Sequence, residues 1–101
     1  MNKNREKQIT AFLDEIIKDK PEIVLKLAVS ELWAKGTVHF SEKTLNATIG
    51  YWEEEQQKNA QRNQIISVET QISVYRTIQK ILREGVTIFD LMKYFVKKKM
   101  I

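Results

Sequence analysis

Seven basic side chains toward the carboxyl end are the residues of this sequence best suited to bind a ligand. They are Arg76, Lys80, Arg83, Lys93, Lys97, Lys98 and Lys99. Guanidinium and ammonium groups form charge-assisted hydrogen bonds to phosphate oxygens, so a surface that gathers them could contact a nucleic-acid backbone. Lysine contacts phosphate as a point charge and carries little sequence information, which argues against base-specific recognition. We treat the seven residues as a candidate nucleic-acid or anion patch.

The net charge of the chain comes from the same region. Residues 71–101 carry seven basic and two acidic side chains, whereas the first 70 residues carry ten basic and eleven acidic ones, and the formal net charge is +4. Lysines at the C-terminal end of a helix also stabilise the negative end of its dipole, which requires no partner. A solvated helix end, a phosphate-binding patch and a contact with an anionic protein or membrane surface therefore all stay open.

Residues that could support catalysis are few. His39 is the single histidine, and it stands among apolar neighbours in TVHF, which is typical of a turn residue bonded to backbone. Glu53, Glu54 and Glu55 are consecutive, and on a helix they point about 100° apart, so they cannot converge on one metal ion. Cysteine is absent, and no P-loop, dinucleotide-binding, metalloprotease or nucleophile-elbow pattern occurs. We expect a protein without enzymatic activity, cofactor or metal.

Five segments place apolar residues every three or four positions, which is the period of an amphipathic helix. They span residues 5–18, 21–35, 41–52, 65–82 and 87–97. The fourth segment is rich in β-branched residues, but it follows the helical period over five turns and has no obvious partner strand. Glycine occurs three times and proline once, so breaks are scarce. The sequence predicts one all-α domain over residues 1–101, a small bundle of about five helices.

Local signals mark where these helices begin and end. Gly36 and Gly85 are natural helix stops, and Ser41 and Thr87 are natural N-caps. Asp90 follows Thr87 by three residues, which predicts a capping box. Two hydrophobic staples are expected across these caps, formed by Phe40 with Leu45 and by Val86 with Leu91. Residues 37–40 alternate in polarity and predict a short extended segment.

The expected core follows from the same periodicity. The second helix should be the most buried, with Leu27 and Leu32 at its centre, and Trp33, Tyr51 and Trp52 should pack around the turn that follows. A ligand pocket lined by those three aromatic residues is the alternative. The last helix should bury the set Ile88, Leu91, Met92, Phe95 and Val96. Residues 53–64 contain no large apolar side chain. We expect them to extend the third helix into solvent, and a polar loop between two halves of the chain is the alternative.

These features favour a small protein that works by binding. No stretch reaches the roughly 18 apolar residues of a membrane span, and a cytoplasmic location is expected. The Lys, Asn and Ile content suggests a bacterial, phage or plasmid source. We expect a regulatory factor acting through protein contacts, with a homodimer crossing near residues 53–64, because a 101-residue core is marginal. A DNA-binding factor using residues 71–101, which have a weak helix-turn-helix outline, and a bacteriocin-immunity-type bundle are the alternatives.

Overall fold

The computed structural model describes residues 3–57 and 67–100, and within these ranges the chain forms α-helices and no strand. The elements are α1 (Lys3–Asp19), α2 (Glu22–Lys35), a 3-10 turn (Thr37–His39), α3 (Glu42–Gln57), α4 (Val68–Arg83) and α5 (Ile88–Lys97). The all-α prediction is confirmed. The predicted extension of the third helix is helical as far as Gln57, and its remaining residues, 58–64, lie outside the described ranges.

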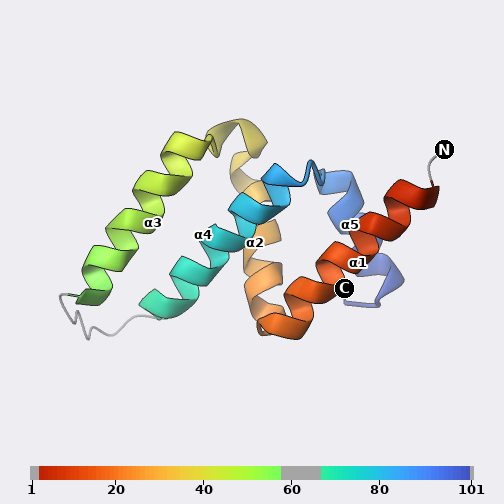
Figure 1. Ribbon diagram of the computed structural model, residues 1–101, viewed down its shortest axis with the longest axis horizontal. Helices are drawn as coiled ribbons and strands as arrows, with labels where there is room; N and C mark the ends of the chain where they lie inside the picture. The colour runs from red at the N-terminus through yellow and green to blue at the C-terminus, as the bar shows by residue number, and fades with distance from the viewer. Residues whose placement is uncertain (1–2, 58–66, 101) are drawn as a thin grey trace.

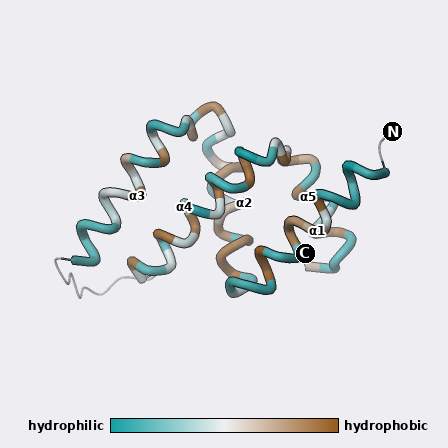
Figure 2. The backbone as a smooth tube through the Cα atoms, in the orientation of Figure 1, coloured by the Kyte–Doolittle hydropathy of each residue, from teal (hydrophilic) through white to brown (hydrophobic). Residues whose placement is uncertain are grey.

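The helices form an elongated molecule with α2 at its centre. Figure 1 shows α3 alongside α4 toward one end, and α1 with α5 toward the other. The principal extents are 48 × 27 × 22 Å. The helix α2 packs against α4 on one side and against α1 and α5 on the other. Figure 2 shows that α2 and α5 carry much of the apolar colour, whereas α3 is largely polar. The central helix α2 and the peripheral helix α5 are thus the two most apolar helices described.

One apolar core joins all five helices. Leu13 from α1, Leu25 from α2, Leu45 from α3, Ile78 from α4 and Leu91 from α5 are almost completely buried. Leu25 belongs to a helix that is apolar around its circumference, and the other four belong to the apolar faces of their helices. Burying these surfaces together removes apolar surface from water. The shared core explains why the helices form one bundle.

The prediction that α2 is the most buried helix is confirmed, and the prediction that Leu27 lies at the centre of the core is wrong. This helix buries more residues than any other described helix, and Leu32 is buried as expected. Leu27 is only half-buried at the edge of the core. Leu25 and Leu32 lie seven residues apart and share a face, whereas Leu27 is turned well away from that face. The centre of the core is therefore Leu25 together with Leu32.

Both predicted N-caps are present. The Ser41 hydroxyl accepts a hydrogen bond from the Thr44 amide at 3.1 Å, and the flanking Phe40 and Leu45 are buried. In α5 the Thr87 hydroxyl accepts from the Asp90 amide at 3.1 Å, and the Asp90 carboxylate accepts from the Thr87 amide at 3.0 Å. This reciprocal pair is the predicted capping box, and it satisfies two amides that the helix leaves unpaired.

The segment before α3 was predicted as extended, and the structure corrects this. Residues Thr37–His39 form a single 3-10 turn, in which the Phe40 amide donates to the Thr37 carbonyl at 3.0 Å. No strand in the described residues is available to pair with this segment, so its backbone groups are satisfied locally. Gly36, with φ of 83°, provides the positive-φ stop that was predicted for α2.

The aromatic residues expected around this turn are mostly in solvent. Trp33 is 68% exposed, Tyr51 is 56% exposed and Trp52 is half-buried. Trp33 follows the buried Leu32 directly and points about 100° away from it, on a side of α2 that the other helices leave uncovered. The rings of Tyr51 and Trp52 meet edge to face at 5.1 Å on the surface of α3. Among the described residues, Trp33 and Tyr51 thus lie in solvent and not in the core around this turn.

Two helices end in the same type of C-terminal motif. After α4, the Val86 amide donates to the Ile81 carbonyl and Gly85 adopts φ of 72°. After α5, the Met100 amide donates to the Phe95 carbonyl at 2.9 Å, and Lys99 takes the left-handed position with φ of 56°. These are Schellman motifs, which turn the chain back toward the helix it has left. Met100 is thereby packed against the core.

Candidate interaction surface

Two of the seven predicted basic residues are engaged with α3. Arg76 of α4 forms an ion pair with Glu53. Arg83 binds the carboxylate of Glu42 through two nitrogens, with Nε at 2.6 Å from Oε1 and a terminal nitrogen at 3.2 Å from Oε2. A guanidinium held by both oxygens of a carboxylate presents fewer free donors to a phosphate. These two arginines therefore join α4 to α3.

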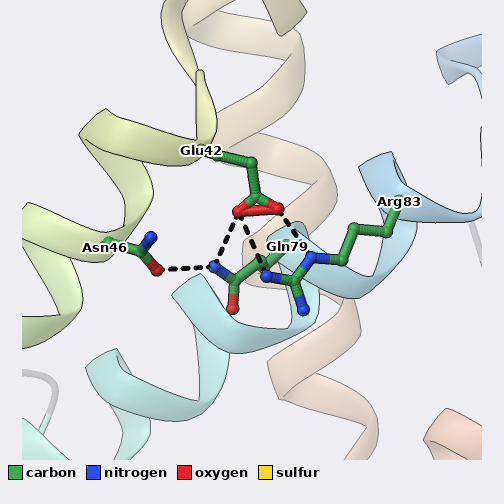
Figure 3. A network of polar contacts seen from close by, with 4 residues as sticks. All are labelled: Glu42, Asn46, Gln79 and Arg83. Atoms are coloured by element: carbon green, nitrogen blue, oxygen red, sulfur yellow. Dashed lines mark hydrogen bonds and ion pairs between the residues drawn. The ribbon is translucent and has the colours of Figure 1, made fainter.

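The Arg83 contact belongs to a polar network drawn in Figure 3. Gln79 Nε2 donates to Glu42 Oε2 at 3.1 Å and to Asn46 Oδ1 at 2.9 Å. The hydrogen bonds from Arg83 hold the pKa of the Glu42 carboxyl below its ordinary value, and Gln79 contributes in the same direction. Glu42 lies in the first turn of α3 and Arg83 in the last turn of α4, where each charge also complements a helix dipole. The network is a structural link on an exposed surface.

The lysines of α5 face a different helix. Lys93 pairs with Glu6 at 3.2 Å and Lys98 with Asp14 at 3.3 Å, and both carboxylates belong to α1. Lys80, on α4, borders a hollow that it shares with Asp19 and other residues of α1. In the part of the chain that the structure describes, Lys80, Lys97 and Lys99 form no ion pair. The seven residues thus divide between the α3 side and the α1 side of the molecule.

Tyr94 connects α5 to α1 from inside the core. Its ring is buried, and its hydroxyl donates to Asp14 Oδ1 at 2.6 Å. This hydrogen bond, together with the nearby Lys98, lowers the pKa of the Asp14 carboxyl, whereas burial and the Asp14 carboxylate raise the pKa of the Tyr94 hydroxyl. The Lys98 ammonium also lies 5.8 Å from the Tyr94 ring centroid. Tyr94 was not among the residues predicted to be buried, although its position three residues after Leu91 places it near the buried face of α5.

The outward side of α5 is apolar as well. Phe89 is 80% exposed and Val96 is 65% exposed, and Met92 lies between them, half-buried. The prediction that Val96 is buried is wrong, because Leu91, Tyr94 and Phe95 form the inner face and Val96 points away from it. Phe89 and Val96 are seven residues apart, which places them on one side of the helix. We call Phe89, Met92 and Val96 the outer face of α5.

This outer face borders a hollow between α1 and α5. The hollow has a volume of about 530 Å³ and is lined by Ile9 from α1 and by the three outer-face residues. Its polar rim consists of Glu6, Asp90, Lys93 and Lys97. An apolar floor with a charged border is the usual composition of a site that receives an apolar side chain or a helix.

The described residues offer few features that would support metal binding, catalysis by histidine or insertion into a membrane. Residues 3–57 and 67–100 contain no cluster of His, Asp and Glu side chains that could hold a metal ion. His39 is exposed and meets the ring of Phe40 edge to face at 5.1 Å. None of the helices described is long and apolar enough to cross a membrane. Comparison with protein families, with curated proteins and with solved structures found no match for this chain.

Proposed function

We propose that this protein works by binding another polypeptide, either a second copy of itself or a different protein, through the outer face of α5. The observation that carries the proposal is the two-sided apolar character of this helix. Seven of its ten residues are apolar, yet only one side of it is covered in the bundle. A helix that is apolar on nearly all sides is normally buried on all sides.

The comparison with α2 supports this interpretation. The helix α2 is similarly apolar around its circumference, and it lies at the centre of the molecule, packed against α1, α4 and α5. It exposes large apolar side chains only near its ends, at Ile23 and Trp33, and its middle is covered. By contrast, α5 lies at the periphery, with Phe89 and Val96 in solvent. Covering these two side chains with a partner removes apolar surface from water, which favours association. The charged rim of the adjacent hollow would orient the partner.

The proposal includes a non-enzymatic, regulatory role in the cytoplasm, as expected from the sequence. The nucleic-acid alternative receives less support, because four of the seven basic residues already have carboxylate partners. Binding to DNA through them would require breaking these pairs or sharing the cations, which reduces the gain from each phosphate contact.

A photo-crosslinking experiment tests the proposal. A benzophenone-bearing phenylalanine analogue replaces Phe89 in one variant and Val38, which is 97% exposed on the 3-10 turn, in a control variant. Each variant is expressed in the cells that normally make the protein and irradiated. We expect a discrete polypeptide adduct from position 89 and none from position 38. The proposal fails if position 89 gives no adduct, or if both positions give the same set of adducts.

A further inference from the structure

We infer that the partner at the outer face of α5 is a second copy of this chain, with the two α5 helices packed antiparallel. This inference rests on the proposed function and names its partner. It is argued from the spacing of the apolar residues and from the distribution of charge along the helix.

The apolar spacing suits a two-fold contact. Phe89 and Val96 stand seven residues apart on one face, with Met92 between them. When two such helices cross antiparallel about an axis near residues 92 and 93, Phe89 of each copy lies on Val96 of the other. The same contact is then made twice, and the interface closes on itself without leaving a complementary patch free. A seven-residue apolar repeat is also the spacing of helices that pack side by side.

The distribution of charge selects the antiparallel orientation. Asp90 lies in the first turn of α5 and Glu84 precedes the helix at the end of α4, whereas Lys97 ends α5 and Lys99 follows it. In an antiparallel pair the acidic start of one helix faces the lysines of the other, and the helix dipoles oppose each other. A parallel pair would instead place lysines against lysines. Across the described residues neither Lys97 nor Lys99 has a carboxylate within ion-pair distance, although the Lys97 ammonium still contributes to lowering the pKa of Asp14. Both lysines can therefore form an ion pair between copies.

Lys93 is the residue that most opposes this arrangement. It lies near the two-fold axis, so the two copies would bring their Lys93 ammonium groups close together. Each ammonium is, however, paired with Glu6 of its own α1 at 3.2 Å. The axis would therefore carry two neutralised pairs, and Lys93 of one copy could also approach Glu6 of the other. The Glu6 carboxylates therefore reduce the electrostatic repulsion between the two Lys93 ammonium groups at the axis.

The size of the contact sets the expected affinity. Three outer-face side chains with a charged rim make an interface at the small end of those found in specific complexes, so we expect a dissociation constant on the order of micromolar. The earlier prediction of a homodimer located the contact near residues 53–64, of which 58–64 lie outside the described ranges. The inference moves the contact to α5.

Disulfide trapping tests the geometry, because the chain has no cysteine of its own. Two single variants, Phe89→Cys and Val96→Cys, are mixed and oxidised. We expect a disulfide between the two variants and little within either variant alone, since two copies of the same position would be about 10 Å apart along the helices. A mixture of Val38→Cys with Val96→Cys measures random collision. The antiparallel arrangement fails if Phe89→Cys bridges to itself as fast as to Val96→Cys, or if no mixture exceeds the collision control.

Sedimentation equilibrium then tests the association itself. The unmodified protein should show twice its 11.9 kDa chain mass at about 100 µM and dissociate on dilution. Val96→Glu should raise the dissociation constant at least tenfold, whereas Val38→Glu should leave it unchanged. A monomer throughout, together with a position-89 adduct to a different protein, would overturn the second-copy inference and leave the proposed function standing. A monomer without any adduct would overturn both.

Discussion

At the scale of single residues, Tyr94 shows how a polar atom is kept at the edge of an apolar core. Its ring is buried with Leu91 and Phe95 on the inner face of α5, and its hydroxyl donates to Asp14. A buried hydroxyl without a partner costs free energy, so the Asp14 carboxylate is what allows a tyrosine at this position. The same carboxylate holds Lys98, so one exposed acid organises two residues of α5.

Replacing Tyr94 with phenylalanine tests this role. The variant Tyr94→Phe should lower the free energy of unfolding at pH 7 by about 1 kcal/mol, because a charge-assisted hydrogen bond is lost and Asp14 can still be hydrated. The folded-state pKa of Asp14 is lowered, so its contribution is present above the unfolded pKa of about 3.9 and is lost as pH falls through the folded pKa. The difference between the two proteins should therefore shrink toward pH 2, as measured by urea unfolding.

Tyr75→Phe is the matched control. The Tyr75 hydroxyl lies 3.4 Å from a carboxylate oxygen of Glu31, which is a long hydrogen bond, and its ring is half-buried. We expect a loss below about 0.5 kcal/mol at pH 7. If both variants lose the same free energy of unfolding, the Tyr94–Asp14 hydrogen bond contributes no more to stability than the longer Tyr75–Glu31 hydrogen bond.

At the scale of elements, the end of α5 is under local strain. Lys99 occupies the left-handed position of a Schellman motif, where a residue with a Cβ atom is less stable than glycine. The motif survives because it returns Met100 to the core. The residue that ends α4 in the same way is Gly85, which carries no such penalty.

Lys99→Gly should therefore stabilise the protein, by about 0.5–1 kcal/mol, as measured by thermal or urea unfolding. Lys97→Gly removes the same charge from the last turn of α5, where glycine is unfavourable, and should destabilise by about 0.5–1 kcal/mol. Because both variants lose one lysine, the opposite signs would separate backbone conformation from charge. A destabilised Lys99→Gly variant would contradict the proposed strain.

What the sequence could predict differs between elements for a physical reason. Caps such as Thr87 with Asp90 depend on residues three apart, and they were predicted correctly. The orientation of α5 was predicted incorrectly, because a helix with apolar residues on both sides gives no signal of which side packs against the core. Val96 was assigned to the core and Tyr94 was overlooked for that reason. Which face of such a helix is buried depends on its tertiary contacts, and the periodicity of the local sequence carries no information about those contacts.

Four of the seven candidate basic residues pair with carboxylates of α1 and α3, which the sequence did not predict for a related reason. The carboxylates of Glu42 and Asp14, which pair with Arg83 and Lys98, are separated from them by 41 and 84 residues along the chain. Charge counted along the chain shows an excess in the last third, but charge in space is balanced by α1 and α3. The patch as a binding site stays a prediction.

At the scale of the whole molecule, the pairing of basic residues with carboxylates determines the salt dependence of DNA binding, if the nucleic-acid alternative holds. Only Lys80, Lys97 and Lys99 of the seven lack an ion pair within the described residues. Each phosphate contact contributes about −0.9 to the slope of log K against log salt, so we expect a slope of about −3 and no sequence preference. Filter binding at about 50–200 mM salt measures it. A slope of about −6 would mean that the ion pairs open on binding, and no binding at 50 mM would end the alternative.

The meeting of α1 with α5 also has a consequence for the order of folding. Arg5 donates to the Glu84 carbonyl at 2.5 Å across 79 residues, and Tyr94 reaches Asp14 across 80. The contacts between α3 and α4 close much shorter loops, such as the 23 residues between Glu53 and Arg76. Closing a longer loop costs more chain entropy, and this cost precedes the stabilising contacts that the closed loop forms. We therefore expect α1 to dock after the α3–α4 pair has formed. Changes at the α1–α5 contact should then act on the unfolding rate and leave the folding rate nearly unchanged.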